Sequence, residues 1–409
     1  MVASDLWFRK VPGNHEESTQ VASTNIPLDV EGAVHDRYTA AAQQAEQSLC
    51  CPVDYDPKYL EVLPRELLER DYGCGNPSRY LQPGETVLDL GSGGGKICYI
   101  AAQVVGAEGR VIGVDVNDEM LGLARRFQPE ISTALGYDNT EFRKGRIQDL
   151  ALDLERFESY LAENAIRGSN DWLRAEAVAR ELREQEPMIA SDSVDVVVSN
   201  CVLNLVRREH RQQLFAEMFR VLKRGGRVVI SDIVSDEPVP QRLQDDPQLW
   251  SGCLSGAFVE DELLRTFEEQ GFYGVELVAR QDDAWATIEG LEFRSVTVRA
   301  YKGKQGACLD HNQAVIYKGP WRSVTDDDGH VLRRGERMAV CEKTFNIYTR
   351  APYAEDILPV PPHEEVAADE APEFDCRRNA VRSPSETKGQ GFRQTQLPSS
   401  DCCGPDSCC

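Results

Sequence analysis

The chain has 409 residues, of which 41% are hydrophobic and 28% are charged. This composition is typical of a globular protein with a sizeable core and excludes the disordered and membrane-spanning classes. Lys and Arg total 45 against 68 Asp and Glu, which gives a formal net charge of -23. Because such a surface repels phosphate backbones, we expect no nucleic-acid partner.

No apolar run approaches the roughly 20 residues that a membrane helix needs, and residues 1–10 lack the apolar stretch of a signal peptide. We therefore expect no membrane association and a cytoplasmic location. The chain has thirteen cysteines, and the cytosol keeps thiols reduced. These cysteines are better interpreted as ligands, redox groups or core residues than as a disulfide framework.

Residues 1–75 are expected to form an N-terminal helical segment with a cysteine loop. The first 30 residues or so are polar without clear periodicity, whereas the Ala- and Gln-rich run 33–50 predicts a helix. Pro52 disfavours helical geometry at Cys51. Cys50 and Cys51 are therefore both expected in a loop that could reach a nearby site.

Residues 76–240 have the pattern of a Rossmann-like, doubly wound, mostly parallel α/β sheet, in which short apolar strands alternate with amphipathic helices. The predicted strands are 86–90, 110–116, 141–145, 194–200 and 227–233. Within this domain, residues 149–188 are rich in Leu, Ala, Glu and Arg and predict an inserted helical pair.

Three further regions follow the sheet domain. Residues 241–292 predict a helical cap that contributes to an acceptor site, with a helix ending at Gly271. Residues 293–350 predict a small β-rich C-terminal domain, and residues 351–409 are rich in Pro, Glu, Ser and Gln, which predicts a disordered tail. The strands of the small domain are expected within 295–303, 312–319 and 338–348.

A strand, a glycine-rich turn and a helix follow one another in residues 85–106 (ETVLDLGSGGGKICYIAAQVVG). Glycine lets the backbone turn sharply and approach a ligand, and the helix start offers N–H groups to an anionic group. Asp115 ends the next predicted strand, where a carboxylate can accept hydrogen bonds from two ribose hydroxyls. We therefore expect an adenosine-containing ligand, although nicotinamide enzymes and purely structural turns share this glycine pattern.

Three widely separated cysteines occupy positions that the fold could bring together. Cys201 follows a predicted strand, at the edge where open α/β sheets bind ligands, and Cys74 and Cys253 could cover that edge from either side. Their separations, 127 and 52 residues, are unlike the local pairs of structural zinc modules. Thiolates select soft ligands, although each cysteine taken singly could equally be a small buried hydrophobic residue.

These segments together resemble arsenite methyltransferases, within the class I S-adenosylmethionine-dependent methyltransferase superfamily. The residues that carry the resemblance are YGCG (72–75), VLDLGSG (87–93), SNCVLNLV (199–206), FAEMFRVLKRGGRVVISD (215–232), WSGCLSGA (250–257), FRSVTV (293–298) and the cysteine-rich end. The similarity covers roughly residues 33–350. It implies methylation of arsenite or methylarsenite, with S-adenosyl-L-methionine as the methyl donor.

The resemblance also implies roles for individual residues. Around the cofactor, the methionine part would be faced by Asp89 and the turn Gly91, Ser92, Gly93 and Gly95, the ribose by Asp115, and the adenine by Met120, Ile147, Gln148 and Asp149. Cys74, Cys201 and Cys253 would hold the arsenic, and Cys50 or Cys51 would be a catalytic redox cysteine. A thiol reductant of thioredoxin or glutathione type would regenerate the thiols.

A lone pair on arsenic needs no general base to attack a methyl group, which agrees with the lack of a recognisable histidine motif in the sequence. Catalysis would come mainly from alignment of the reacting atoms, which can contribute about 7 to 11 kcal/mol. The sequence departs from the family at Lys96-Ile97, where many relatives have Arg-Asp, and in the long insert 149–188. These departures could alter the substrate or its final methylation state.

Two other interpretations stay open at this stage. A methyltransferase for a small organic acceptor would have merely structural cysteines. A thiol-rich metal or redox protein would transfer no methyl group, and the intact turn 91–95 with Asp115 weighs against it. Of the remaining cysteines, Cys98 and Cys341 predict core positions and Cys308 has no assignment. The tail cysteines could capture a soft ion, exchange disulfides or be dispensable; they are Cys402, Cys403, Cys408 and Cys409.

Overall fold

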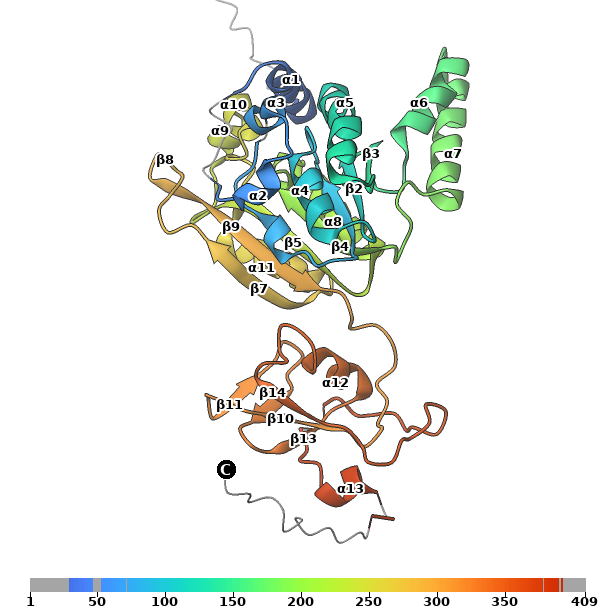
Figure 1. Ribbon diagram of the computed structural model, residues 1–409, viewed down its shortest axis with the longest axis vertical. Helices are drawn as coiled ribbons and strands as arrows, with labels where there is room; N and C mark the ends of the chain where they lie inside the picture. The colour runs from blue at the N-terminus through green and yellow to red at the C-terminus, as the bar shows by residue number, and fades with distance from the viewer. Residues whose placement is uncertain (1–28, 47–52, 71, 378, 390, 393–409) are drawn as a thin grey trace, which may run out of the picture.

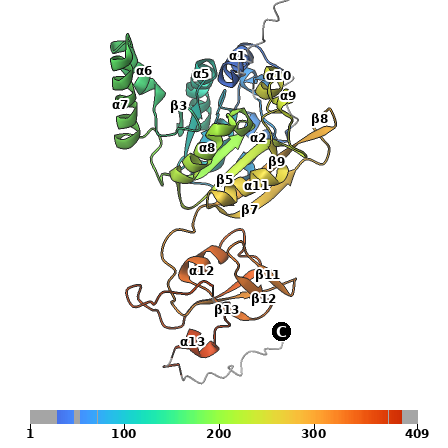
Figure 2. The same cartoon turned by 180° about the vertical axis from the view of Figure 1, so that it is seen from behind.

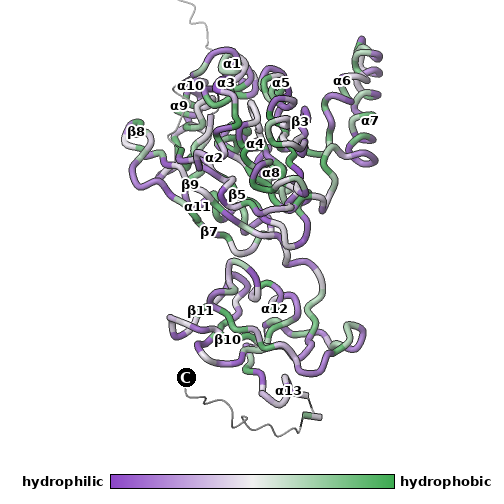
Figure 3. Tube along the Cα trace, viewed as in Figure 1, coloured by the Kyte–Doolittle hydropathy of each residue, from purple (hydrophilic) through white to green (hydrophobic). Residues whose placement is uncertain are grey.

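The computed structural model describes residues 29–46, 53–70, 72–377, 379–389 and 391–392. A large sheet with helices on both faces makes up most of the molecule, and a smaller β-rich domain lies at one end of its long axis (Figures 1 and 2). Hydrophobic residues gather on the inner strands, and hydrophilic residues follow much of the outer surface (Figure 3). Among the described residues, no helix is long and apolar enough to cross a membrane.

The main sheet has nine strands, ordered β3-β2-β1-β4-β5-β9-β7, with β6 beside β5 and β8 beside β9. Strands β1 to β5 are parallel, whereas β9 runs antiparallel to β5, β7 and β8. This confirms the predicted Rossmann-like, mostly parallel fold. The strands are β1 (Thr86–Leu90), β2 (Arg110–Asp115), β3 (Thr140–Lys144), β4 (Val194–Asn200), β5 (Leu222–Ser235), β6 (Phe258–Val259), β7 (Tyr273–Arg280), β8 (Ala286–Ile288) and β9 (Leu291–Tyr301).

Two hydrophobic clusters lie on opposite faces of this sheet, because alternate side chains of a strand point to opposite sides. On β1, Leu88 belongs to one cluster and Val87 to the other. Helices α4 (Lys96–Val105) and α5 (Asp118–Leu135) cover the Val87 face, and α8 (Arg208–Val221) and α11 (Glu260–Glu269) cover the Leu88 face. The inner parallel strands β1, β2 and β4 are therefore buried on both sides, which explains their nearly continuous apolar sequences, whereas the edge strand β3 is only partly buried and more polar.

Shorter helices and the insert complete the large domain. The N-terminal segment contains α1 (Val30–Gln43), α2 (Pro57–Leu60) and α3 (Arg65–Glu69), and the region after β5 contains α9 (Gln241–Gln244) and α10 (Pro247–Ser251). The predicted helical pair of the insert is confirmed as α6 (Leu154–Glu163) and α7 (Ser169–Gln185). The predicted helix at residues 33–50 begins earlier and ends at Gln43, because Gln44 is already extended. Cys50 and Cys51 lie outside the described residues.

The expected boundary between cap and C-terminal domain is wrong. The region 241–292 contains β6, β7 and β8 besides its helices, and β9, which we assigned to the C-terminal domain, belongs to the main sheet. β9 pairs with β5 along its length, from the pair of Arg227 with Tyr301 to the pair of Ser235 with Phe293. This pairing places β5 between β4 and β9. An isolated strand pattern does not reveal which sheet it joins.

The small domain begins after β9 and extends further than the sequence predicts. Residues beyond 350 were expected to be disordered, but β14 pairs with β10 and α13 carries a capping box at Ser383. Residues 342–348, within a predicted strand, form a helix. The elements are β10 (Ala314–Tyr317), β11 (Ser323–Thr325), β12 (Val331–Arg333), β13 (Arg337–Ala339), α12 (Glu342–Tyr348), β14 (Ile357–Val360) and α13 (Pro384–Lys388). The four tail cysteines lie outside the described residues.

The aromatic side chains under α11 generate a prediction for stability. Phe267 is fully buried, and its ring packs edge to face against Phe215 and Phe272. Replacement by alanine (Phe267→Ala) should lower the free energy of unfolding by about 3 to 5 kcal/mol, measured by urea denaturation. Leu173→Ala, at a side chain on α7 that is 60% exposed, should change it by less than about 0.5 kcal/mol. Equal losses would contradict this description of the core.

Candidate active site

A cavity of about 410 Å³ opens at the carboxyl ends of β1, β2 and β4. This is the edge at which open α/β sheets bind ligands, and the volume falls in the range of cofactor sites. The wall includes every residue predicted for the cofactor except Gly95 and Asp149: Asp89, Gly91, Ser92, Gly93, Asp115, Met120, Ile147 and Gln148. Cys201 also lies on the wall.

The two exceptions have structural roles near the cavity. Gly95 precedes α4 with a φ of 89°, and a Cβ there would lie 2.9 Å from Cζ of Phe142, so only glycine allows this helix start. Asp149 was expected beside the adenine, but its carboxylate accepts hydrogen bonds from the Arg183 guanidinium of α7. This ion pair connects the helical insert to the edge of the domain.

The glycine turn presents its backbone to the cavity. Gly91 and Gly93 have φ angles of 69° and 52°, and a Cβ on Gly91 would lie 2.5 Å from Cγ1 of Val202. The Gly93 N–H donates to Oδ2 of Asp115 and the Asn117 N–H donates to Oδ1, each at 2.9 Å. Each carboxylate oxygen thus retains a lone pair for a ligand. Burial raises the pKa of Asp115, against the lowering effect of these two hydrogen bonds.

One polar atom on this wall has no partner among the described residues. Ser92 Oγ is buried, yet no described group is within hydrogen-bond distance of it. A buried hydroxyl without a partner costs free energy, so a polar ligand that bonds to it would gain the same amount. Together with the Asp115 carboxylate and the exposed backbone of the turn, this atom fits a polar, adenosine-containing cofactor.

The N-terminal helix α1 supplies a wall that the sequence did not predict. His35 and Tyr38 of α1 line the cavity with Tyr72, whose hydroxyl donates to the Ala41 carbonyl and accepts from the Glu46 N–H, each at 3.0 Å. The Tyr38 hydroxyl lies 4.0 Å from Sγ of Cys253. His35 and Tyr38 belong to no motif, and only the fold brings α1 over the sheet edge.

The three cysteines that the sequence singles out come together at this edge. Cys74, Cys201 and Cys253 are all buried and belong to one hydrophobic cluster. The sulfur atoms of Cys74 and Cys201 and a carboxylate oxygen of Asp232 lie within 4.8 Å of one another. The Cys253 thiol donates to the Cys201 carbonyl at 2.9 Å. The three thiols therefore adjoin the cavity at the point where Cys201 forms its wall.

A buried polar network holds the backbone of each thiol-bearing segment. Asn200, the last residue of β4, accepts hydrogen bonds from the N–H groups of Cys74 and Gly75 at 2.9 and 3.0 Å. The Cys201 N–H donates to the Ser231 carbonyl on β5 at 2.8 Å. The Asn204 amide donates to the Cys253 carbonyl at 3.1 Å and to Oδ1 of Asp232 at 2.9 Å. The ends of β4 and β5 thus fix all three segments.

Burial dominates the electrostatics of the thiol group. Burial raises the pKa of Cys74. Burial also raises the pKa of Cys201, and hydrogen bonds to Cys253 and Cys74 raise it further. Burial also raises the pKa of Asp232 to about 6, against three lowering backbone hydrogen bonds. The thiols of Cys74 and Cys201 are therefore protonated near neutral pH, and a soft cation that binds them displaces protons.

Sequence reasoning missed the residues that arrange the thiols, Asn200, Asn204 and Asp232. Asn200 stands beside Cys201 in the SNC segment and Asp232 lies within the predicted strand 227–233, but nothing in the sequence pairs either with Cys74. Cys98 is confirmed as a core residue, since it is fully buried on α4.

Two known protein families match parts of this chain. Residues 81–186 and 174–271 match a family described as a methyltransferase domain, and residues 304–392 match a "Domain of unknown function (DUF8838)". An arsenite methyltransferase from Aquipseudomonas alcaligenes is 33% identical over 316 residues, which cover 73% of this chain and 81% of that protein. One from Mus musculus is 28% identical, covering 75% of each chain.

A solved structure is also similar. The crystal structure of an arsenic (III) S-adenosylmethionine methyltransferase from Chlamydomonas reinhardtii matches with a TM-score of 0.52 and 26% identity. The match covers 80% of this chain and 100% of that one.

The network around Asn200 generates a second prediction. Asn200→Ala removes the acceptor of the buried Cys74 N–H and of the partly buried Gly75 N–H, and it should lower the free energy of unfolding by about 2 to 3 kcal/mol, measured by urea denaturation. Ser199→Ala, on the preceding residue, removes one hydrogen bond to the Leu90 carbonyl and should cost about 1 kcal/mol. A loss at Ser199 as large as that at Asn200 would refute the special role of the amide.

Proposed function

Since the chain belongs to the arsenite methyltransferase family, we propose that Cys74, Cys201 and Cys253 hold trivalent arsenic while a methyl group is transferred to it. The observation that carries this proposal is the meeting of three buried thiols at one end of the cofactor cavity. Thiolates are soft ligands that select soft, thiophilic acceptors. The methyl acceptor is thus arsenite or methylarsenite.

The chain's own residues would bind and orient the cofactor. The Asp115 carboxylate would accept hydrogen bonds from the ribose hydroxyls, Ser92 Oγ and the backbone of the glycine turn would bind the methionine part, and Met120, Ile147 and Gln148 would enclose the adenine. S-adenosyl-L-methionine supplies an electrophilic methyl group, which the arsenic lone pair takes while the electrons of the broken S–C bond stay on sulfur. The protein contributes alignment, because the thiols fix the direction of the lone pair.

Binding of arsenite exchanges oxygen for sulfur. Three As–O bonds break, three As–S bonds form, and the three thiol protons leave in three molecules of water. The product is electrically neutral and suits the hydrophobic cluster around the thiols. This exchange is favoured at a site whose empty state carries protonated thiols.

Methyl transfer oxidises arsenic formally by two electrons, so a second methylation requires two electrons from a pair of thiols, which become a disulfide. We propose Cys50 or Cys51 as one of these redox cysteines. A thiol reductant of thioredoxin or glutathione type would then reduce the disulfide by thiol–disulfide exchange. This requirement favours a cytoplasmic location, where such reductants are maintained.

Substitution of the thiols tests this proposal. With labelled S-adenosylmethionine, arsenite and a thiol reductant, Cys201→Ser should form methylarsenicals at least about 100-fold more slowly than the wild type, because the acceptor is no longer aligned. Its cofactor affinity, measured by calorimetry, should stay within about threefold. The control is Cys98→Ser, because Cys98 lies in the core behind the cavity wall and its hydrogen bond to Asp89 can also be made by serine.

Either of two results would contradict the proposal. Equal products from Cys201→Ser and the wild type would remove this thiol from the mechanism. Cofactor binding without methylation of any arsenical would favour a small organic acceptor instead.

A further inference from the structure

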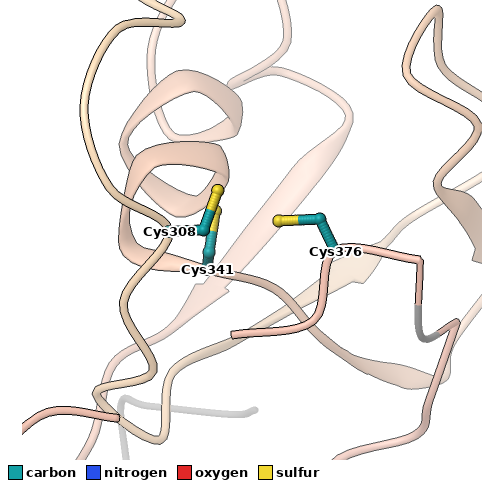
Figure 4. A group of neighbouring side chains, drawn as sticks. All are labelled: Cys308, Cys341 and Cys376. Carbon is teal, nitrogen blue, oxygen red and sulfur yellow. The ribbon is translucent and has the colours of Figure 1, made fainter. Parts of the chain in front are cut away.

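Three cysteines of the small domain also approach one another. The sulfur atoms of Cys308, Cys341 and Cys376 lie within 4.8 Å of one another, and the Cys376 side chain points toward the other two (Figure 4). All three lie within residues 304–392, outside the methyltransferase match. The described wall of the active-site cavity includes none of them.

Backbone hydrogen bonds hold the three thiol-bearing segments together. The Cys308 carbonyl accepts from the Phe374 N–H, two residues before Cys376, and the Leu309 carbonyl accepts from the Glu342 N–H, each at 2.8 Å. Cys341 caps α12, and its sulfur accepts from the Thr344 N–H at 3.4 Å. Three segments that are far apart in the sequence are thus fixed with their thiols side by side.

The group combines rigidity with access. Cys341 is fully buried, whereas Cys308 and Cys376 are partly exposed, so a small solute can reach the sulfur atoms from outside. Burial opposes ionisation of Cys308, but hydrogen bonds to Cys376 and Lys343 hold its pKa below the usual value, whereas burial raises the pKa of Cys376. A positive charge beside a thiol favours the thiolate, which is the form that binds soft ions.

The number of ligands distinguishes between the soft ions that thiols bind. Among the described residues, no fourth His, Cys, Asp or Glu ligand atom joins this group. Structural zinc sites are almost always tetrahedral, with four ligands. Trivalent arsenic instead forms three bonds to sulfur and keeps its fourth direction for a lone pair, which matches three thiols.

We propose that Cys308, Cys341 and Cys376 form a second binding site for arsenite, separate from the thiols of the active site. The choice of arsenic as ligand rests on the proposed function. Binding breaks three As–O bonds and forms three As–S bonds, and the three protons leave in water, so no electrons are exchanged. Since the described wall of the cofactor cavity includes none of these thiols, the site retains arsenite without methylating it.

The test measures arsenic bound per chain by mass spectrometry of the intact, reduced full-length protein. Cys50, Cys51 and the four tail cysteines are replaced by serine in every sample, so that only the described thiols remain. This parent protein should bind about two arsenic atoms, and Cys308→Ser/Cys376→Ser should lower the value by about one. Cys74→Ser/Cys201→Ser should remove the other atom, and Cys98→Ser, at a thiol outside both groups, should remove none.

A second measurement uses the wild-type chain, so its result does not depend on whether a variant folds. Peptide mapping after treatment with N-ethylmaleimide should show that arsenite protects Cys308 and Cys376 from alkylation by at least about tenfold. Unchanged alkylation would overturn the inference. So would a Cys308→Ser/Cys376→Ser protein that keeps all its arsenic, or a purified protein that holds zinc there and does not exchange it for arsenite.

The two proposals can fail separately. If Cys74→Ser/Cys201→Ser keeps all its arsenic while the small-domain variant loses one atom, the second site stands and the proposed active-site ligands fail. If the opposite pattern is found, the active site stands and the second site is overturned.

Discussion

The position of the three active-site thiols depends on a buried polar network at the ends of β4 and β5. Asn200, Asn204 and Asp232 bind backbone groups of segments that are up to 126 residues apart, as in the bond from the Cys74 N–H to Asn200. Buried polar groups are costly unless each finds its partner, so this network permits few alternative arrangements. The sheet therefore fixes the thiols mainly through their backbones.

The surroundings of the thiols also decide which ligand they suit. The active-site group lies in a hydrophobic cluster beside the carboxyl of Asp232. Three thiolates on trivalent arsenic carry no net charge, whereas three thiolates on a divalent ion carry a negative charge that Asp232 and the apolar neighbours would disfavour. In the small domain, Lys343 offers a positive charge and two thiols are partly exposed. The two groups of thiols thus differ in the charge beside them and in their burial, although both consist of three cysteines.

The sequence predicted those parts of the fold that depend on local patterns. Strands β1, β2, β4 and β5 were found because burial on both faces requires apolar runs, and the glycine turn was found because a φ above zero requires glycine. Long-range contacts determine the parts of the fold that were not predicted. β9 has the same alternation whichever sheet it joins, and the Pro-rich segment after residue 350 is ordered by contacts such as that between Arg382 and Asp310. The sequence singled out the three cysteines through the place of Cys201 after a predicted strand, and the resemblance to a family gave them their role as arsenic ligands. The amides that hold them were not predicted.

Cys201 and Cys253 adopt φ angles of 64° and 62°, in the left-handed region. This conformation costs an ordinary residue roughly 1 to 2 kcal/mol, and glycine, asparagine and aspartate are the residues that adopt it routinely. A cysteine at each of these two positions therefore carries a backbone strain that glycine, asparagine or aspartate would largely avoid. In a descendant that no longer needed the thiols, we expect glycine or asparagine to replace Cys201 and Cys253 first. Such replacements would mark relatives in which thiol binding has been lost.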